Sequence, residues 1–224
     1  AAVVALIMLA SCTVIEIIPT KSTDSGNKTS SSPTKPGVTK TSETVDVPPQ
    51  TDTNIRPGEP ARVSFVAAGG NIIHDAVRED AAKRAEEGSA YNFLPMYQGI
   101  ASTVSSADLS FINMECPVAG SSFGYSGYPY FNAPEESVQA LIDVGFDVFN
   151  INNNHMLDKG TAALASTINY FKSLQSILMI GGYNGEEDLY TPRTVTINGI
   201  KIGFISLNYG SNIETIDPSY GITV

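Results

Sequence analysis

From residue 61 onward, short apolar runs typical of strands alternate with amphipathic stretches typical of helices. Strands are predicted over four runs, at 62–68, 108–113, 146–151 and 175–181. Helices are predicted between them, at 75–87, 91–107, 134–145 and over a stretch with Leu164, Ile168, Phe171 and Leu174 on one face. Two later strand-like runs flank Asn198-Gly199, which is a strong two-residue hairpin signal. The pattern predicts an α/β fold with a mixed sheet covered by helices.

Proline and glycine positions predict where some of these elements end. Pro134 is expected at the first position of the third helix, and Gly145 just after its last turn. The adjacent Gly69 and Gly70 are expected to end the first strand, because glycine lets the backbone turn sharply or approach a ligand closely.

Polar side chains concentrate in the loop 152–160, at the expected carboxyl end of the third strand. The loop carries three side-chain amides together with His155 and Asp158. Open α/β sheets place their ligands at this edge, and imidazole nitrogen with amide or carboxylate oxygen suits Mn, Fe or Zn. The alternative interpretation is that the Asn and Asp residues are ordinary turn formers and that His155 is a solvated loop residue.

Two further segments carry candidate chemistry. Asn113 and Glu115 follow the second strand and, being two positions apart, project similarly from an extended chain. Both can therefore face one metal centre, although a lone Glu at a strand end is commonly just solvated. The aromatic-rich segment 120–132 is predicted either to contact substrate as a lid or to pack its own aromatics on the domain.

Three motifs then occur in order and at fitting spacing. They are an opening strand and loop that reaches His74 and Asp75, the Asn113-x-Glu115-x-Pro117 segment, and the segment Asn154-His155 with Asp158-x-Gly160. Together they resemble the motifs of the CapA (poly-γ-glutamate capsule synthesis) family, which is similar to the calcineurin-like metallophosphatases. The resemblance covers residue 61 to the end. It implies an α/β/β/α metallophosphatase-like sandwich of two sheets, truncated here at its carboxyl-terminal side.

This resemblance implies roles for individual residues in a metal-dependent, phosphoesterase-like hydrolase. His155 becomes an acid or charge stabiliser, and Asp158 orients the loop or His155. The implied metal ligands are Glu115, Asn154, Asn113 and His74, for Mn, Zn or Fe ions that form a two-metal site if it is complete. His74 is equally well interpreted as a loop or helix-start histidine. The alternative function is a non-catalytic module that binds polymer or partner proteins through a degenerate metal site.

One position departs from the family pattern. The family has a Gly-Asp pair at the end of its first strand, and the Asp is a metal ligand, whereas this chain has Gly70 there. Asn71 and Asp75 carry oxygen atoms nearby, but neither occupies the matching position. We therefore expect weak binding of the first metal and a low turnover. Gly70→Asp would strengthen metal binding if the backbone at position 70 does not need a positive φ.

Composition limits the possible partners. The 224 residues include 13 Lys+Arg against 23 Asp+Glu, for a formal net charge of -10. This balance argues against a nucleic-acid-binding surface. It permits an anionic substrate, because a bound metal can supply local positive charge. The resemblance implies poly-γ-glutamate or another anionic polymer, and the membrane proteins of capsule synthesis, as partners.

The first 60 residues differ in character from the rest. The apolar run 1–10 leads into Leu9-Ala10-Ser11-Cys12, which overlaps its end and resembles a bacterial lipobox, so residues 1–12 are interpreted as a signal-peptide remnant with a lipidated cysteine. Residues 13–60 are a Ser/Thr/Pro-rich linker that is expected to be disordered, and 61–224 form the folded part. We expect a chain that is one piece of a longer product, anchored by lipid at the extracytoplasmic face of the bacterial membrane.

We predict that Cys12→Ala releases the protein from the membrane into the medium, because two acyl chains give stable anchoring and their loss removes it. Metabolic labelling with a fatty acid checks the modification directly. Cys116 is the other cysteine in the chain and serves as the control, so Cys116→Ala should leave the label in place. A labelling experiment that finds no acyl chain on Cys12 would contradict the interpretation.

Overall fold

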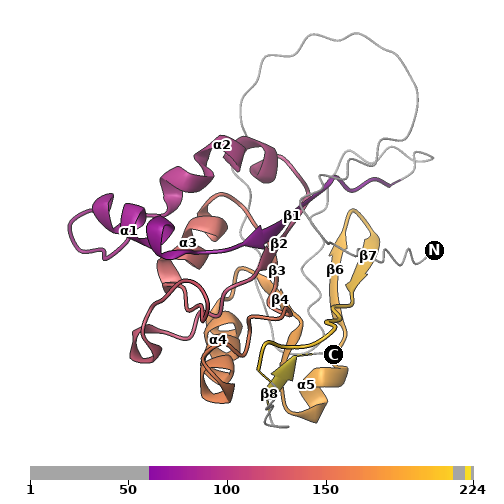
Figure 1. Ribbon diagram of the computed structural model, residues 1–224. Coiled ribbons are helices and arrows are strands. Elements are labelled where there is room, and N and C mark those ends of the chain that lie inside the picture. The colour runs from indigo at the N-terminus through magenta and orange to yellow at the C-terminus, as the bar shows by residue number, and fades with distance from the viewer. Residues whose placement is uncertain (1–60, 214–219, 223–224) are drawn as a thin grey trace, which may run out of the picture.

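The computed structural model describes residues 61–213 and 220–222 (Figure 1). Its centre is a purely parallel sheet in the order β1-β2-β3-β4. These strands are β1 (Phe65–Asn71), β2 (Leu109–Met114), β3 (Val148–Asn150) and β4 (Leu178–Ile180). Because every strand lies beside the one that precedes it in the chain, all four carboxyl ends meet at one edge of the sheet. The expected mixed sheet was wrong, because the predicted hairpin forms a separate sheet of its own.

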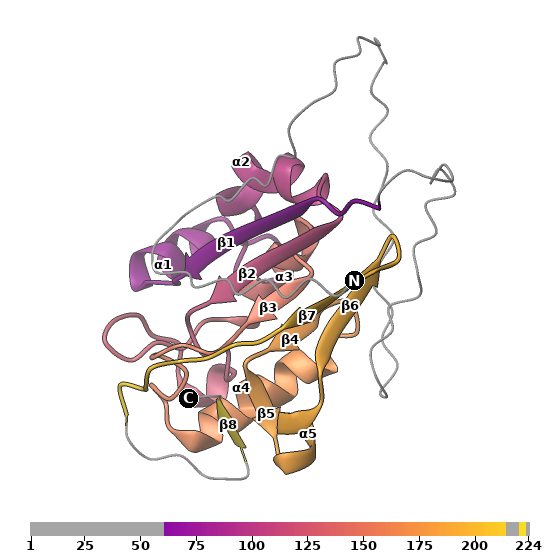
Figure 2. The same ribbon diagram turned by 90° about the vertical axis from the view of Figure 1, so that its right-hand side faces the viewer.

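Helices connect the successive strands of this sheet. They are α1 (Asp75–Lys83), α2 (Leu94–Ser105), α3 (Glu135–Asp143) and α4 (Thr161–Ser173). A right-handed crossover at each step places all of them on the same face. Figure 2 shows this layer of helices behind the sheet, with the hairpin of β6 (Arg193–Ile197) and β7 (Ile200–Phe204) in front of it.

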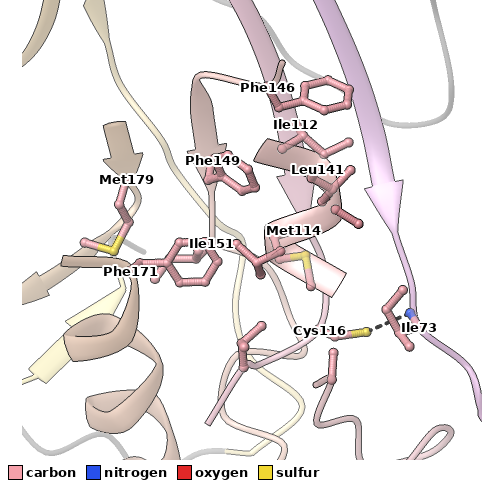
Figure 3. Packing of buried hydrophobic residues seen from close by; sticks show 14 of the residues in the cluster. Ile73, Ile112, Met114, Cys116, Leu141, Phe146, Phe149, Ile151, Phe171 and Met179 are labelled. Atoms are coloured by element: carbon pink, nitrogen blue, oxygen red, sulfur yellow. Dashed lines mark hydrogen bonds between the residues drawn. The ribbon is translucent and has the colours of Figure 1, made fainter. Parts of the chain in front are cut away.

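The main core lies between the sheet and the helices. Alternate side chains of β2 and the end of β3 enter it, among them Ile112, Met114 and Ile151 (Figure 3). They meet Leu141 from α3 and Phe171 from α4, which are both fully buried. The neighbouring positions on the strands project to the other face, as expected for a period of two along an extended chain.

A smaller core fills the space between the sheet and the hairpin. Leu109, Val148 and Ile180 of the sheet pack there with Val195 of β6. The hairpin turn has φ +51° at Asn198 and +75° at Gly199, as a two-residue turn between twisted strands requires. The structure therefore confirms the predicted hairpin and an α/β fold consistent with the first part of a metallophosphatase-like sandwich.

The remaining elements lie beyond β4. They are β5 (Gly182–Asn184), α5 (Glu186–Tyr190) and β8 (Tyr220–Ile222), and β5 pairs antiparallel with β8. A short 3-10 turn, η1 (Ser121–Phe123), lies in the loop between β2 and α3. None of the helices in the described ranges is long and apolar enough to cross a membrane. Cys12 and the linker 13–60 lie outside the described residues.

Several expected boundaries were wrong, among them those placed at Gly70 and Pro134. The first strand runs through Gly69 and Gly70 instead of ending there, because pairing with β2 resumes at Asn71 after an irregularity in register. Pro134 precedes α3 rather than starting it, since its φ of -65° and ψ of 149° are extended. Gly145 does follow the last turn as predicted, with φ +106°, and a Cβ there would lie 3.3 Å from the Cα of Ser105.

Cys116 belongs to the core beside β1. It is fully buried, and the backbone N–H of Ile73 donates to its Sγ at 3.2 Å (Figure 3). Burial raises the pKa of the thiol to about 12, so the neutral form is the one that the fold favours.

We predict that Cys116 resists alkylation in the folded protein and reacts only after unfolding, because the reactive thiolate is suppressed. The raised pKa also means that its stabilising contribution is present below the ordinary thiol pKa of about 8.5 and declines as the pH rises above it. Peptide-resolved mass spectrometry after iodoacetamide treatment, with and without urea, measures this. Equal labelling in both conditions would contradict the burial.

Candidate active site at the carboxyl edge of the sheet

The predicted site residues come together at the carboxyl edge of β1, β2 and β3. Glu115 follows β2, and its backbone N–H donates to the carbonyl of Asn71 at the end of β1 at 3.2 Å. The loop after β3 is fastened to β2, since Asn153 Nδ2 donates to the Met114 carbonyl at 3.0 Å. His155 and Glu115, which are 40 positions apart in sequence, therefore follow neighbouring parallel strands at the same edge.

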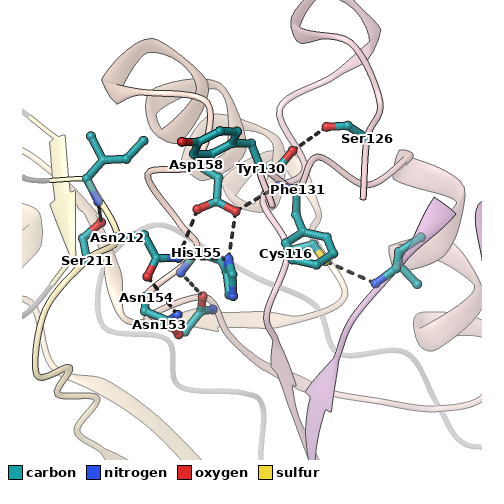
Figure 4. Close-up of polar contacts among 12 residues, drawn as sticks. Cys116, Ser126, Tyr130, Phe131, Asn153, Asn154, His155, Asp158, Ser211 and Asn212 are labelled. Carbon is teal, nitrogen blue, oxygen red and sulfur yellow. Dashed lines mark hydrogen bonds and ion pairs between the residues drawn. The ribbon is translucent and has the colours of Figure 1, made fainter. Parts of the chain in front are cut away.

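His155 and Asp158 form an imidazole–carboxylate pair within this loop (Figure 4). Nδ1 of His155 lies 2.8 Å from Oδ2 of Asp158, and the Asp158 side chain has no exposed surface, whereas 15% of the His155 side chain is exposed. A buried carboxylate accepts a hydrogen bond from Nδ1–H, which leaves Nε2 as the nitrogen with the free lone pair. The pair is local in sequence, because the loop 152–160 brings two residues three positions apart into contact.

Phe131 completes one wall of this pair. Its backbone N–H donates to Asp158 Oδ2 at 2.9 Å, and its ring packs edge-to-face on the imidazole of His155, with centroids 4.9 Å apart. The aromatic segment 120–132 thus packs partly on the domain. Tyr128 and Tyr130 in the same segment stay 72% and 54% exposed, so these two side chains are available to a ligand.

Asn153 and Asn154 have different roles although they are neighbours. Asn153 is buried. Its Oδ1 accepts from the His155 backbone N–H at 2.9 Å, and its Nδ2 donates to the Met114 carbonyl at the end of β2. Asn154, the expected metal ligand, donates from Nδ2 to Asn212 Oδ1 at 3.2 Å. Asn153 and Asn212 were not singled out from the sequence, because nothing local distinguishes them from other loop asparagines.

Asn113 lies on the face of the sheet that carries the hairpin. Its Oδ1 accepts from Asn150 Nδ2 at 2.9 Å, and Asn150 Oδ1 in turn accepts from the Ser206 hydroxyl at 2.6 Å. The amide oxygen that was expected to bind a metal is therefore engaged in a hydrogen-bonded chain between two strands and the segment after β7.

Gly70 and Glu115 lie next to each other. A Cβ at position 70 would be 3.3 Å from Glu115 Oε2, so a family Asp there would face this carboxylate. Gly70 has φ +65°, a conformation that side chains other than glycine rarely adopt. The condition attached to Gly70→Asp is therefore not met, and the substitution carries backbone strain in addition to a second negative charge.

Neither nearby oxygen donor replaces the missing carboxylate. Asn71 is buried, with Oδ1 accepting from the Tyr97 hydroxyl at 2.8 Å, and burial raises the pKa of that phenol so that it remains a donor. Asp75 Oδ1 accepts from Arg78 Nη2 and from the Gly127 backbone N–H, both at 2.9 Å. The Arg78 guanidinium lowers the pKa of Asp75.

His74 is found at a helix start, which was its alternative interpretation. It is the N-cap of α1, where its Nδ1 accepts from the Asp75 backbone N–H at 2.9 Å. Its ring is edge-to-face with Phe131, with centroids 6.1 Å apart. In the part of the chain that the structure describes, no group of three His, Cys, Asp or Glu side chains converges as a metal site. The described residues alone therefore do not fit the implied two-metal centre.

A parallel sheet with helices on one face, a hairpin on the other and polar loops at its carboxyl edge places the chain in the class of α/β proteins. Comparison with known sequences gives the family. The family profile described as "Bacterial capsule synthesis protein PGA_cap" matches residues 64–221. The chain belongs to this family of bacterial capsule synthesis proteins, which confirms the resemblance found from the motifs.

A curated relative gives the same picture over a shorter stretch. The chain is similar to the "Capsule biosynthesis protein CapA" of Bacillus anthracis, with 32% identity over 73 residues. This segment covers 33% of the chain and 18% of the relative. The match therefore spans less than two thirds of that relative's length, and it does not carry the activity of the whole protein.

We predict that Asn153→Ala lowers the free energy of unfolding by roughly 2–4 kcal/mol, because it leaves the buried Met114 carbonyl and the partly buried His155 backbone N–H without these partners. Urea unfolding of the full chain measures the change. Asn184→Ala, at an exposed position, is the matched control and should change stability by about 0.5 kcal/mol or less. Equal unfolding midpoints for the two variants would show that Asn153 does not fasten the loop.

Proposed function

We propose that this protein acts in the synthesis or export of an anionic capsule polymer such as poly-γ-glutamate, as a hydrolase-like enzyme that uses His155 for acid–base chemistry. Family membership supports the role in capsule formation. The observation that carries the enzymatic part is the fully buried Asp158 carboxylate, which holds Nδ1 of a partly exposed imidazole at 2.8 Å.

The geometry gives each group of the pair a chemical task. Asp158 accepts a hydrogen bond from Nδ1–H and stabilises the imidazolium that forms when Nε2 of His155 takes up a second proton. Nε2 of His155 then accepts a proton from an attacking group, or gives one to a leaving group, on the polymer. The Phe131 ring covers one side of the imidazole and limits the access of water there.

The described residues do not complete a site for a divalent ion, so no step of the proposal runs through such an ion. Glu115 is the described residue best suited to hold one. Among residues 61–213 no hydrogen bond or ion pair engages its carboxylate, and it faces the open position left by Gly70. Further ligands are needed to complete a metal site at Glu115. We assign the proton transfer to the pair of His155 and Asp158 alone.

The proposed place of action is the extracytoplasmic face of the membrane. A lipid on Cys12 would anchor the chain there, and the linker 13–60 would let the folded part reach the growing polymer. The membrane proteins of capsule synthesis are the partners that this position would bring within reach.

A second candidate function is a non-catalytic module that binds the polymer or a partner of the capsule machinery. It is favoured by Gly70, which lacks the carboxylate of the family motif, and by the engagement of Asn71 and Asp75 in other contacts. In this case the exposed Tyr128 and Tyr130 would form part of the binding surface.

We predict that His155→Gln and Asp158→Asn abolish capsule formation while the protein still binds purified poly-γ-glutamate. Loss of an acid–base group typically costs about 10²–10⁴-fold in rate, whereas binding contacts elsewhere are kept. Capsule polymer is measured in a capsule-forming bacterium that lacks its own copy of the gene and carries the full-length protein. Calorimetric titration with the polymer measures binding.

Matched controls are available on the same domain. Asp143→Asn repeats the chemical change of Asp158→Asn at an exposed position of α3. Glu79→Gln likewise replaces an exposed carboxylate by its amide on α1. Both variants should leave capsule formation intact. Variants at His155 and Asp158 that form normal capsules would overturn the enzymatic proposal. Joint loss of binding and capsule would favour the binding module instead.

A further inference from the structure

The segment 205–213, here named the crossing segment, brings a distant part of the chain to the site. It continues from β7 and runs across the front of the sheet toward the loop 152–160 (Figure 2). Ser206 fastens its first part to the end of β3 through the 2.6 Å hydrogen bond to Asn150 Oδ1. Asn212, near its other end, then reaches the imidazole–carboxylate pair (Figure 4).

Asn212 uses its backbone and both ends of its side-chain amide in this contact. Its backbone N–H donates to the Asn154 carbonyl at 3.0 Å, and its Oδ1 accepts from Asn154 Nδ2 at 3.2 Å. Its Nδ2 donates to Asp158 Oδ1 at 3.4 Å and lies 3.2 Å from His155 Nδ1. One residue therefore touches three members of the loop from 54 to 58 positions away.

The orientation of the amide follows from these partners. Asn154 donates to the oxygen, which turns the NH₂ group toward Asp158 and His155. Asp158 Oδ2 already accepts from His155 Nδ1 and from the Phe131 backbone, so the donor from Asn212 serves the other oxygen. A carboxylate without exposed surface gains from a donor at each oxygen, and these donors fix its rotation about the side-chain bonds.

We propose that Asn212 is a positioning residue that locks the Asp158 carboxylate, and through it the His155 imidazole, from the hairpin side of the fold. The assignment rests on the proposed acid–base role of His155. The contacts to Asn154 hold the loop, while the NH₂ group acts on the pair. The contact from the crossing segment accordingly completes the hydrogen bonding of the Asp158 carboxylate.

The two histidines of the chain make the proposal measurable, because the structure gives them opposite tautomers. His74 Nδ1 accepts from a backbone N–H, so its proton is on Nε2. The Asp158 carboxylate that His155 Nδ1 faces can only accept, so we assign the proton of His155 to Nδ1, and the Asn212 amide nitrogen 3.2 Å away then makes no hydrogen bond to that atom. The chain has 2 histidines, so each gives an identifiable signal and His74 serves as the internal reference.

The test compares the full-length protein with Asn212→Leu and Asn212→Gln, labelled with nitrogen isotope in histidine. Ring-nitrogen chemical shifts are recorded at about pH 8, above the ordinary histidine pKa of about 6.5. Leu keeps much of the bulk and removes the hydrogen bonds of the amide, so we expect the single Nδ1–H pattern of His155 to be lost to a mixture of tautomers. Gln keeps the carboxamide and should restore the pattern at least in part.

Two controls separate positioning from general damage. Asn184→Leu makes the same change at an exposed position away from the site and should leave both histidines as in the wild type. His74 should be unchanged in every variant, and an equal disturbance of His74 in Asn212→Leu would overturn the proposal. If Asn212→Leu does not fold, as judged by circular dichroism, Asn212→Ala takes its place.

The outcome is independent of the test of the proposed function. A His155 signal that keeps its wild-type pattern in Asn212→Leu would overturn the positioning role, whatever the capsule phenotype. Loss of the pattern, together with a fall in capsule polymer of about 10–100-fold as is typical for orienting partners, would support it. Failure of His155→Gln to affect the capsule would refute the enzymatic function, yet the tautomer result would still report on Asn212.

Discussion

The structure of the site depends on the burial of one charged group, the carboxylate of Asp158. Its side chain has no exposed surface, and a buried charge is tolerated only where donors replace the water that it has lost. The donors come from three separate parts of the chain, namely the Phe131 backbone, the His155 ring and the Asn212 amide. The hydrogen bonds to this carboxylate thus fix the aromatic segment, the loop 152–160 and the crossing segment relative to one another.

The general fold could be predicted from the sequence because it depends on local rules. Hydrophobic periodicity separates strands from helices, and Asn198-Gly199 has the chemistry that a two-residue hairpin turn needs. The boundaries at Gly70 and Pro134 were wrong for a different reason. Pairing with β2 carries β1 through two glycines, and the extended backbone of Pro134 places it before α3. Both outcomes are decided by tertiary contacts that periodicity does not contain.

The site could be predicted only in part. His155 and Asp158 were found because they lie in one loop and match a family motif, while their roles in catalysis stay predictions. Phe131 and Asn212 contact the same pair, although they lie 27 and 54 positions from Asp158 in the sequence. Their residue types alone do not predict these contacts. The proposed metal ligands show the same limit, since the contacts that engage Asn113 and His74 arise from partners that the motif does not include.

The strand order of the central sheet has a consequence for how the molecule is made. Each new strand pairs with the one synthesised just before it, so the sheet can grow one strand at a time from the amino-terminal side. Asp158 and His155 enter the fold with this growing sheet, whereas Asn212 arrives only after the hairpin has formed. In this order of folding, His155 and Asp158 come together before the Asn212 amide reaches them.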